Sequence, residues 1–236
     1  MKFFNRYKPI TVNCYTWDKH VYKYASIQTS KNFYPIWYKK LIKEKNKEDI
    51  FSTDISQCVG FKKLYQNGFV IPLWSELFLS IGEINNPSID WQFADKKSNI
   101  EFHPLSQMGD WLNENDIQHC KLQSPWKIEC NEDIDFFWSE MSWNTSINTM
   151  KVLPAIVDYK HQNASEINLL IQRTKERQNI KLDFNTPMAH IVPLSERKLI
   201  IKNHLINLDE WKEKDFPRFF FTERYLKSKK LCPINK

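Results

Sequence analysis

The sequence predicts a mainly β protein, built as an antiparallel sandwich or barrel with a few short helices. Three observations predict this class. Apolar and polar residues alternate with period two in several segments, Pro, Asn and Asp separate these short segments, and helical spacing is rare. Of the 236 residues, 42% are hydrophobic and 14% aromatic, enough to form a core and to exclude a disordered protein. We expect one β-rich domain over residues 1–236, with an extended N-terminal segment to about residue 55 and a helical C-terminal tail from about residue 205.

In the first third of the chain, two segments have helical features and a strand pattern follows them. Residues 38–49 are rich in Lys and Glu, which predicts a surface helix. Residues 56–66 have helical spacing, and Gly68 stands where it would close that helix. Over residues 69–81 nearly every odd position is apolar, so one face of a strand would be buried. Pro72 is expected to interrupt this strand or to place it at an edge.

The rest of the chain predicts short strands and one short helix. Alternation predicts strands at Ile89–Phe93, Trp126–Cys130, Ile167–Ile171, Ile180–Phe184 and Met188–Leu194. A charged turn over residues 175–179 joins the third of these strands to the fourth. Asn207 and Glu210 have the spacing of a capped helix start, and this helix should end near Phe216, before Pro217.

The net charge of +6 is unevenly distributed along the chain. Residues 64–150 carry 4 basic and 13 acidic side chains, whereas residues 1–63 carry 13 and 5 and residues 151–236 carry 17 and 10. An acidic middle between basic ends indicates complementary surfaces, either within one fold or between subunits. The alternative is a mixed solvated surface on which the signs segregate by chance.

Nucleic acid is the usual partner considered for a basic protein, and the composition disfavours it here. Only 6 of the 34 basic residues are Arg, the side chain whose planar fork suits bases and phosphates. Lys227, Lys229 and Lys230 remain candidates for weak phosphate contacts. The alternative for these lysines is a frayed terminal segment.

Cysteine usage and hydropathy bear on localisation. The five cysteines are scattered and form no Cys-x-x-Cys pair, which fits a reducing compartment and argues against a zinc knuckle or a redox motif. No apolar run approaches the roughly 18 residues that a membrane span needs. The first residues become polar too early for a signal peptide. We therefore expect no membrane partner and no secretion.

A divalent metal is the cofactor that the histidines suggest. A non-haem iron site needs two His and a carboxylate, commonly with His-x-Asp or His-x-Glu on one strand, and no His of this chain has that spacing. His103, His161 and His190 are the candidate ligands if the fold gathers them from separate strands. The alternative is three isolated histidines on the surface or in the core.

An aromatic cluster is the second candidate site. Phe136, Trp138 and Trp143 lie within eight residues and are the candidates for stacking against a ligand, a base or a sugar. The alternative is that two packed layers share these rings. No catalytic motif accompanies them: a Gly-x-Ser-x-Gly elbow is absent, and the carboxylates of residues 132–135 have the pattern of a solvated acidic turn.

Four stretches carry a resemblance to a known family: Cys58–Trp74, Lys121–Ile128, Val152–Asp158 and Asn185–Arg197. Together they resemble an uncharacterised family of large tailed marine phages, including cyanophages, with relatives in bacteria. The resemblance implies a jelly-roll, a fold of the double-stranded β-helix type. Members have Pro at the position of Val59 and Gly at that of Asn185, and Asn tolerates the left-handed backbone that Gly favours, so this turn should survive. The family has no established activity and supplies no catalytic residues.

These observations lead to one main hypothesis and two alternatives. The main one is a non-enzymatic phage-type module that binds a protein partner, self-associates or assembles into a larger structure, in the host cytoplasm or in the virion. The first alternative is a cupin-like, metal-dependent oxygenase or isomerase that uses the three candidate histidines. The second is a weak nucleic-acid binder that uses the basic C-terminal segment.

Overall fold

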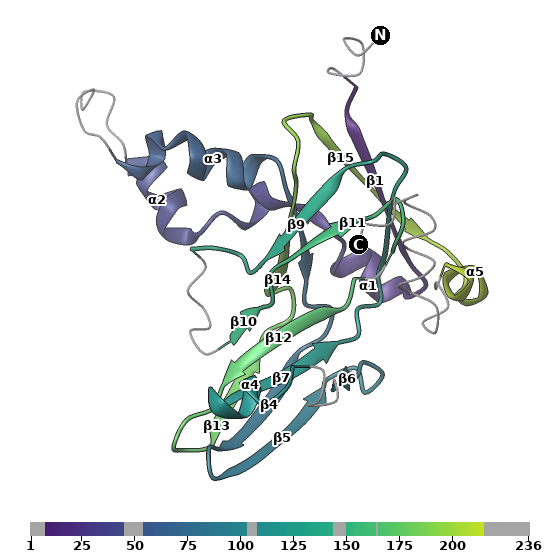
Figure 1. The fold of residues 1–236 in the computed structure, drawn as a ribbon. Coiled ribbons are helices and arrows are strands. Elements are labelled where there is room, and N and C mark those ends of the chain that lie inside the picture. The colour runs from purple at the N-terminus through teal and green to yellow at the C-terminus, as the bar shows by residue number, and fades with distance from the viewer. Residues whose placement is uncertain (1–7, 45–53, 103–107, 144–149, 164, 215–236) are drawn as a thin grey trace, which may run out of the picture.

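A computed structural model describes residues 8–44, 54–102, 108–143, 150–163 and 165–214. The predicted fold class is confirmed: the protein is mainly β, with several antiparallel sheets and five short α-helices in the described residues, an arrangement consistent with a sandwich. None of the helices in these ranges is long and apolar enough to cross a bilayer. Figure 1 shows the sheets filling the middle of the molecule, with helices at its sides.

Two of the four sheets have three strands each. The three-stranded sheet that joins the two ends of the described chain has the order β15 (Leu199–Leu205), β1 (Ile10–Thr16) and β8 (Lys127–Cys130). In it β1 is the central strand, parallel to β15 and antiparallel to β8. A second three-stranded sheet has the order β13 (Gln178–Leu182), β4 (Leu77–Glu83) and β5 (Asn86–Phe93). Residues that were expected to form an extended N-terminal segment therefore contribute a central strand.

The other two sheets are larger and antiparallel throughout. One has the order β10 (Met150–Val152), β12 (Ile167–Gln172), β7 (Ile117–Leu122) and β6 (Ile100–Glu101). The other has the order β11 (Ala155–Asp158), β9 (Asp135–Ser139), β14 (Pro187–Pro193), β3 (Phe69–Pro72) and β2 (Gln28–Thr29). Alternate side chains of all four sheets pack into a shared core, in which Trp126 is the largest fully buried side chain.

The helices are short and mark the edges of the sheets. They are α1 (Lys19–Tyr24), α2 (Ile36–Glu44), α3 (Val59–Gln66), α4 (Trp111–Glu114) and α5 (Leu208–Glu213), with 3-10 turns η2 (Ser30–Phe33) and η3 (Ile55–Gln57). The predicted start of α5 is confirmed, because Asn207 and Glu210 form a reciprocal capping box. The helix ends at Glu213, with Lys214 as its C-cap, earlier than the predicted end near Phe216.

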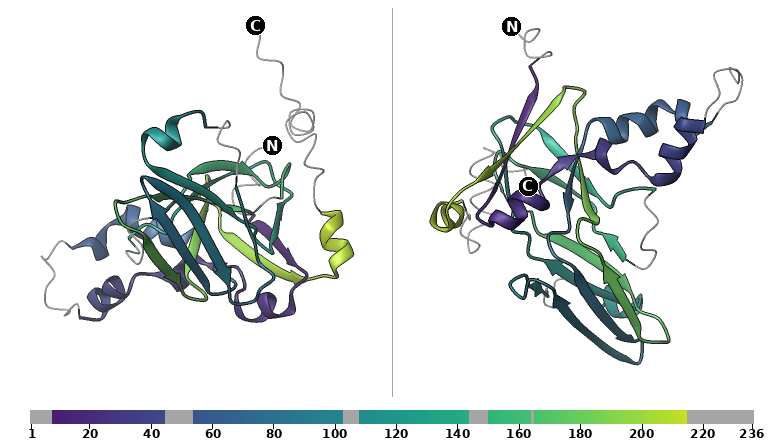
Figure 2. Two further views of the ribbon diagram at one scale, coloured as in Figure 1. Left: turned by 90° about the horizontal axis from the view of Figure 1, so that it is seen from below. Right: turned by 180° about the vertical axis from the view of Figure 1, so that it is seen from behind.

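Helices α2 and α3 form a layer at one side of the sheets, seen in Figures 1 and 2. A small second core holds this layer against β3 and consists of Tyr38, Phe61, Tyr65, Val70 and Met141. The helix predicted over residues 38–49 begins at Ile36 and is described as far as Glu44. Tyr38 is only 1% exposed, so this helix buries one side rather than lying free on the surface. Helix α3 ends with Asn67 as its C-cap, one residue before Gly68.

The strands predicted from alternation are present, and their partners were not predictable. Pro72 ends β3, as expected, and the chain resumes as β4 at Leu77. Strands β12 and β13 flank the charged turn but do not pair with each other: β12 pairs with β7, and β13 pairs with β4. The chain leaves the sheet of β12 at Arg173 and enters the sheet of β13. Arg173 is buried, and its backbone N–H donates to the Asp116 carbonyl at 2.8 Å.

The segregated charges meet within the fold. Ion pairs join the basic C-terminal segment to the acidic middle segment at Arg173–Asp116, Arg177–Asp90, Lys181–Glu76, Arg197–Glu132 and Lys214–Glu129. Of the two arrangements that the charge pattern allowed, the structure therefore contains the one within a single chain. Each exposed ion pair contributes little to the free energy of unfolding. Together, the pairs favour packing of the basic C-terminal strands against the acidic middle segment.

The turn before β14 depends on the backbone of Asn185. This residue has a φ of 67°, the left-handed conformation expected for the position. Its N–H donates to the Leu73 carbonyl at 2.8 Å, and the N–H of Leu73 donates to the Thr186 carbonyl at 2.8 Å, which ties the turn to the end of β3. The prediction that Asn preserves this turn is confirmed.

Substitutions at Asn185 should separate backbone strain from packing, because its side chain is exposed. We expect Asn185→Gly to leave the free energy of unfolding unchanged or slightly higher. Asn185→Val should lower it by about 1–2 kcal/mol, since a β-branched residue is strained at a left-handed φ. Urea denaturation of the three proteins measures the difference, and a Val variant as stable as the wild type would contradict the assignment of the turn.

Candidate functional site

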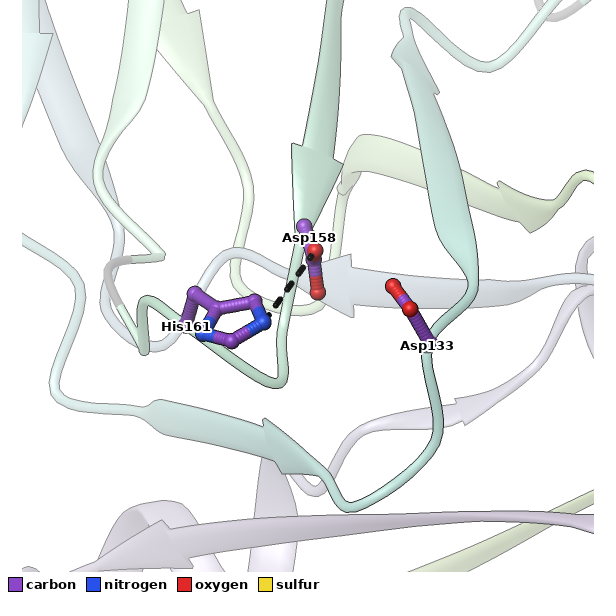
Figure 3. Close-up of side chains that lie close together, drawn as sticks. All are labelled: Asp133, Asp158 and His161. Carbon is purple, nitrogen blue, oxygen red and sulfur yellow. Dashed lines mark ion pairs between the residues drawn. The ribbon is translucent and has the colours of Figure 1, made fainter. Parts of the chain in front are cut away.

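Three side chains of types that can bind a metal lie together beyond the paired strands β9 and β11: Asp133, Asp158 and His161 (Figure 3). Asp158 is the last residue of β11, and its carbonyl accepts hydrogen bonds from the N–H groups of His161 and Gln162, so that the chain turns back on itself. Antiparallel pairing of β9 with β11 sets Asp135 opposite Asp158. The loop that precedes β9, with Asp133, therefore reaches the same place.

The geometry of this cluster suits a cation. One ligand atom from each side chain lies within 4.8 Å of the others. The Nε2 atom of His161 is 4.0 Å from Oδ2 of Asp158, and Oδ1 of Asp158 accepts from the Lys160 N–H at 2.9 Å. Asp158 is 1% exposed, the His161 side chain is 12% exposed, and Asp133 is open to solvent. Two carboxylates and an imidazole form a donor set that binds first-row divalent metals.

The surroundings of the cluster are acidic. Cys130 is buried next to it, and burial is the main cause of its raised pKa. A hydrogen bond with the Glu132 backbone and the charge of Arg197 lower this pKa, whereas the charges of Glu132 and Asp158 raise it. Glu132 is held by the Arg197 guanidinium through both carboxylate oxygens, one of them at 2.9 Å from Nη2. Glu132 is therefore committed to Arg197, and the metal-ligating atoms remain those of the cluster.

The three histidines predicted as metal ligands are not brought together as a set. His161 belongs to the cluster just described, whereas His190 lies in the middle of β14, fully buried, with its ring centroid 6.0 Å from that of Tyr65. His190 has no place in the metal-ligating group found among the described residues. His103 lies outside the described residues.

The three aromatic residues predicted to stack a ligand are divided between two environments. Phe136 and Trp138 are alternate residues of β9 that face the core, with exposed fractions of 0% and 5%. The Trp138 indole N–H donates to the Tyr159 hydroxyl at 2.7 Å. Trp143 is 55% exposed and packs against Trp37 of α2. Burial in the core therefore corrects the stacking assignment of Phe136 and Trp138, because a ligand cannot reach them.

The basic residues Lys227, Lys229 and Lys230, predicted as weak nucleic-acid contacts, lie outside the described residues.

A shallow depression opens on the outer face of the β13–β4–β5 sheet, with a volume of about 420 Å³. Two cross-strand rows border it: Lys181, Phe78 and Gln92 in one, and Asn179, Ser80 and Asp90 in the other. Leu79, Trp91 and Ile180, which occupy the positions between these rows, complete the lining. The Phe78 ring is 45% exposed at the centre of this face.

Of these two sites, the sequence identified only His161 of the metal cluster, and it identified no residue of the depression. The i, i+3 spacing of Asp158 and His161 was visible, but Asp133 joins them only through the register of β9 on β11. Alternation over residues 69–81 predicted the buried side of β4, and the same pattern implies that Phe78 and Ser80 share the opposite side. The pattern did not predict which strands flank β4 in the sheet.

Comparison with known proteins adds no assignment: no protein-family model and no curated protein matches this chain. The function must therefore be argued from the geometry.

Proposed function

We propose that this protein is a non-enzymatic binding module whose β13–β4–β5 face binds a saccharide. The observation that carries this proposal is the depression on that face, where the half-exposed Phe78 lies between Lys181 and Gln92 in a cross-strand row. The Nζ atom of Lys181 is 5.8 Å from the centroid of the Phe78 ring. The volume of the depression, about 420 Å³, falls within the range typical of small-molecule sites. The resemblance to the marine-phage family is the basis on which we also propose a phage-type protein.

The free hydrogen-bonding groups on this face favour a hydroxyl-rich ligand. The side-chain amides of Gln92 and Asn179 have no hydrogen-bond partner within the described part of the chain. Each amide offers two donors and an acceptor. A sugar hydroxyl both donates and accepts, so it can satisfy either end of an amide, whereas a phosphate oxygen can only accept. Phe78 provides the apolar surface against which the C–H face of a pyranose ring packs.

The charges of this face favour a neutral ligand over an anionic one. Arg177 donates to Ser80 at 2.9 Å and to Ser88 at 3.2 Å, and it pairs with Asp90 at 3.4 Å. Lys181 pairs with Asp183 at 2.9 Å and with Glu76 at 3.3 Å. Both cations are thus balanced by carboxylates of the same surface, and little attraction remains for a phosphate or a carboxylate.

A matched pair of phenylalanines makes the proposal testable. Phe137 is 38% exposed on the outer side of β9, in a different sheet, and its exposure is close to that of Phe78. On a glycan microarray, whose density compensates for a weak monovalent affinity, we expect the wild type and Phe137→Ala to bind the same glycans. Phe78→Ala should reduce binding by about tenfold or more, and Asn179→Ala by about fivefold, because each loses a direct contact.

Two outcomes of the array experiment would contradict the proposal. If the wild type retains no glycan, or if Phe78→Ala binds as well as Phe137→Ala does, the face is not a saccharide site. Thermal unfolding of each variant provides the folding control. The two Phe→Ala substitutions remove a half-exposed ring and Asn179→Ala removes a surface amide, so all three should leave the core intact.

A further inference from the structure

A second site, on different residues from the sheet face, is indicated by the cluster of Asp133, Asp158 and His161. These side chains are of two chemical types and come from two segments that only the fold brings together. A bound metal holds its oxygen and nitrogen donors about 3–4 Å apart, as metal–ligand distances near 2 Å require. The present separations, all within 4.8 Å, are thus about one ångström from a closed site. Asp133 is exposed, so its side chain can rotate to close that gap without disturbing the core.

The position of Asp158 adds to this geometry. Its exposed fraction is 1%, and its Oδ1 accepts from the Lys160 N–H at 2.9 Å. Its Oδ2 faces Nε2 of His161 at 4.0 Å, so these two atoms are close to the separation at which they would share one ion. Directly opposite on β9 stands another acid, Asp135, and like charges in such cross-strand positions are destabilising. A divalent cation between Asp133, Asp158 and His161 would offset this concentration of negative charge.

We propose that Asp133, Asp158 and His161 bind one divalent transition-metal ion, either Mn²⁺ or Zn²⁺. Carboxylates alone would suit Mg²⁺ or Ca²⁺, whereas an imidazole nitrogen in the set shifts the preference toward Mn²⁺ and Zn²⁺. Three protein donors leave the other coordination positions to water. The ion would join the loop before β9 to the turn after β11, and its structural effect would be to fix the ends of these two strands.

Isothermal titration of the full-length, untagged chain with MnCl₂ and with ZnCl₂, after treatment with a chelator, tests this site. We expect one equivalent of metal to bind, with a rise in the unfolding temperature of about 5 °C or more once the free metal reaches a hundred times Kd. Asp133→Asn and His161→Gln should each weaken binding by about tenfold or more. Asp110→Asn is the matched control, because Asp110 is an exposed acid whose side chain makes no capping hydrogen bond.

Asp158→Asn tests the buried ligand, and the exposed Asp133 keeps the proposal falsifiable if that variant does not fold. The proposal is supported if Asp133→Asn loses metal binding while its metal-free unfolding temperature stays at the wild-type value and Asp110→Asn binds normally. It is overturned if the wild type binds neither Mn²⁺ nor Zn²⁺ at millimolar concentrations. It is also overturned if Asp133→Asn and His161→Gln bind as tightly as the wild type does.

Discussion

Gly68→Ala is expected to lower the free energy of unfolding by about 3 kcal/mol, the upper end of the usual cost of overpacking a core. A Cβ atom at this position would lie 2.6 Å from Nε2 of His190, 2.7 Å from Oγ of Ser30 and 3.0 Å from the carbonyl oxygen of Ile191. All three neighbours are buried, and the last is backbone in the middle of β14. The glycine is required here for space, because α3 passes into β3 directly against β14.

Gly60→Ala provides the control for this substitution. Gly60 lies within α3, and a Cβ atom there would meet only Sγ of Cys58, at 3.9 Å. Ala is a better helix former than Gly by about 1 kcal/mol, so this variant should be as stable as the wild type or more stable. Urea denaturation of both variants distinguishes the two effects. If Gly68→Ala unfolds at the wild-type urea concentration, β14 and α3 are not packed as closely as described.

Acidification should destabilise the protein through His190, by about 3 kcal/mol between neutral pH and pH 4. Burial lowers the pKa of this imidazole from 6.5 to about 4, against a smaller opposite effect of the Leu64 backbone. Between these two pKa values the unfolded chain binds the proton and the folded chain does not. The contribution of His190 is therefore complete above pH 6.5 and is lost as the pH falls from 6.5 toward 4.

His190→Gln removes this titration and isolates its effect. We expect the free energy of unfolding of the variant to depend less steeply on pH than that of the wild type over the window from 6.5 to 4. An NMR titration of the wild-type imidazole gives a direct readout, since its ring protons should keep the shifts of the neutral form at pH 5. A midpoint near 6.5 for His190, or equal slopes for the two proteins, would show that the ring is not buried as described.

Strand composition could be predicted from the sequence more readily than strand pairing. Segments with one buried face, such as the one that becomes β4, alternate visibly and were predicted. Strand β1 alternates equally well, with Ile10, Val12 and Cys14 buried and the residues between them partly exposed. Its partner β15 has no such pattern, because its side chains are partly exposed on both faces. A pairing between two such distant strands leaves no local trace in either.

Prediction of the candidate sites was limited in the same way, because a sequence pattern specifies neither which face of a strand is buried nor which strands pair. Residues 135–139 carry rings at three successive positions, and alternation alone does not tell which face of the strand turns inward. The fold buries Phe136 and Trp138 and leaves Phe137 outside, so that two of the three predicted stacking residues became core. The metal cluster depends on a register between two strands about twenty residues apart, which no spacing within either segment specifies.

The parallel pairing of β1 with β15 has a consequence for folding during synthesis on the ribosome. Each residue of β1 pairs with a residue of β15 that is synthesised 189 positions later, as in the pair Ile10 and Leu199. At ordinary elongation rates of 5–20 residues per second, β1 waits about 10–40 s with one edge unpaired, even after β8 has covered the other. An apolar strand with an open edge invites pairing with another chain. Premature termination before residue 199 would make that exposure permanent, so truncated nascent chains should be the aggregating species in cells that express this protein.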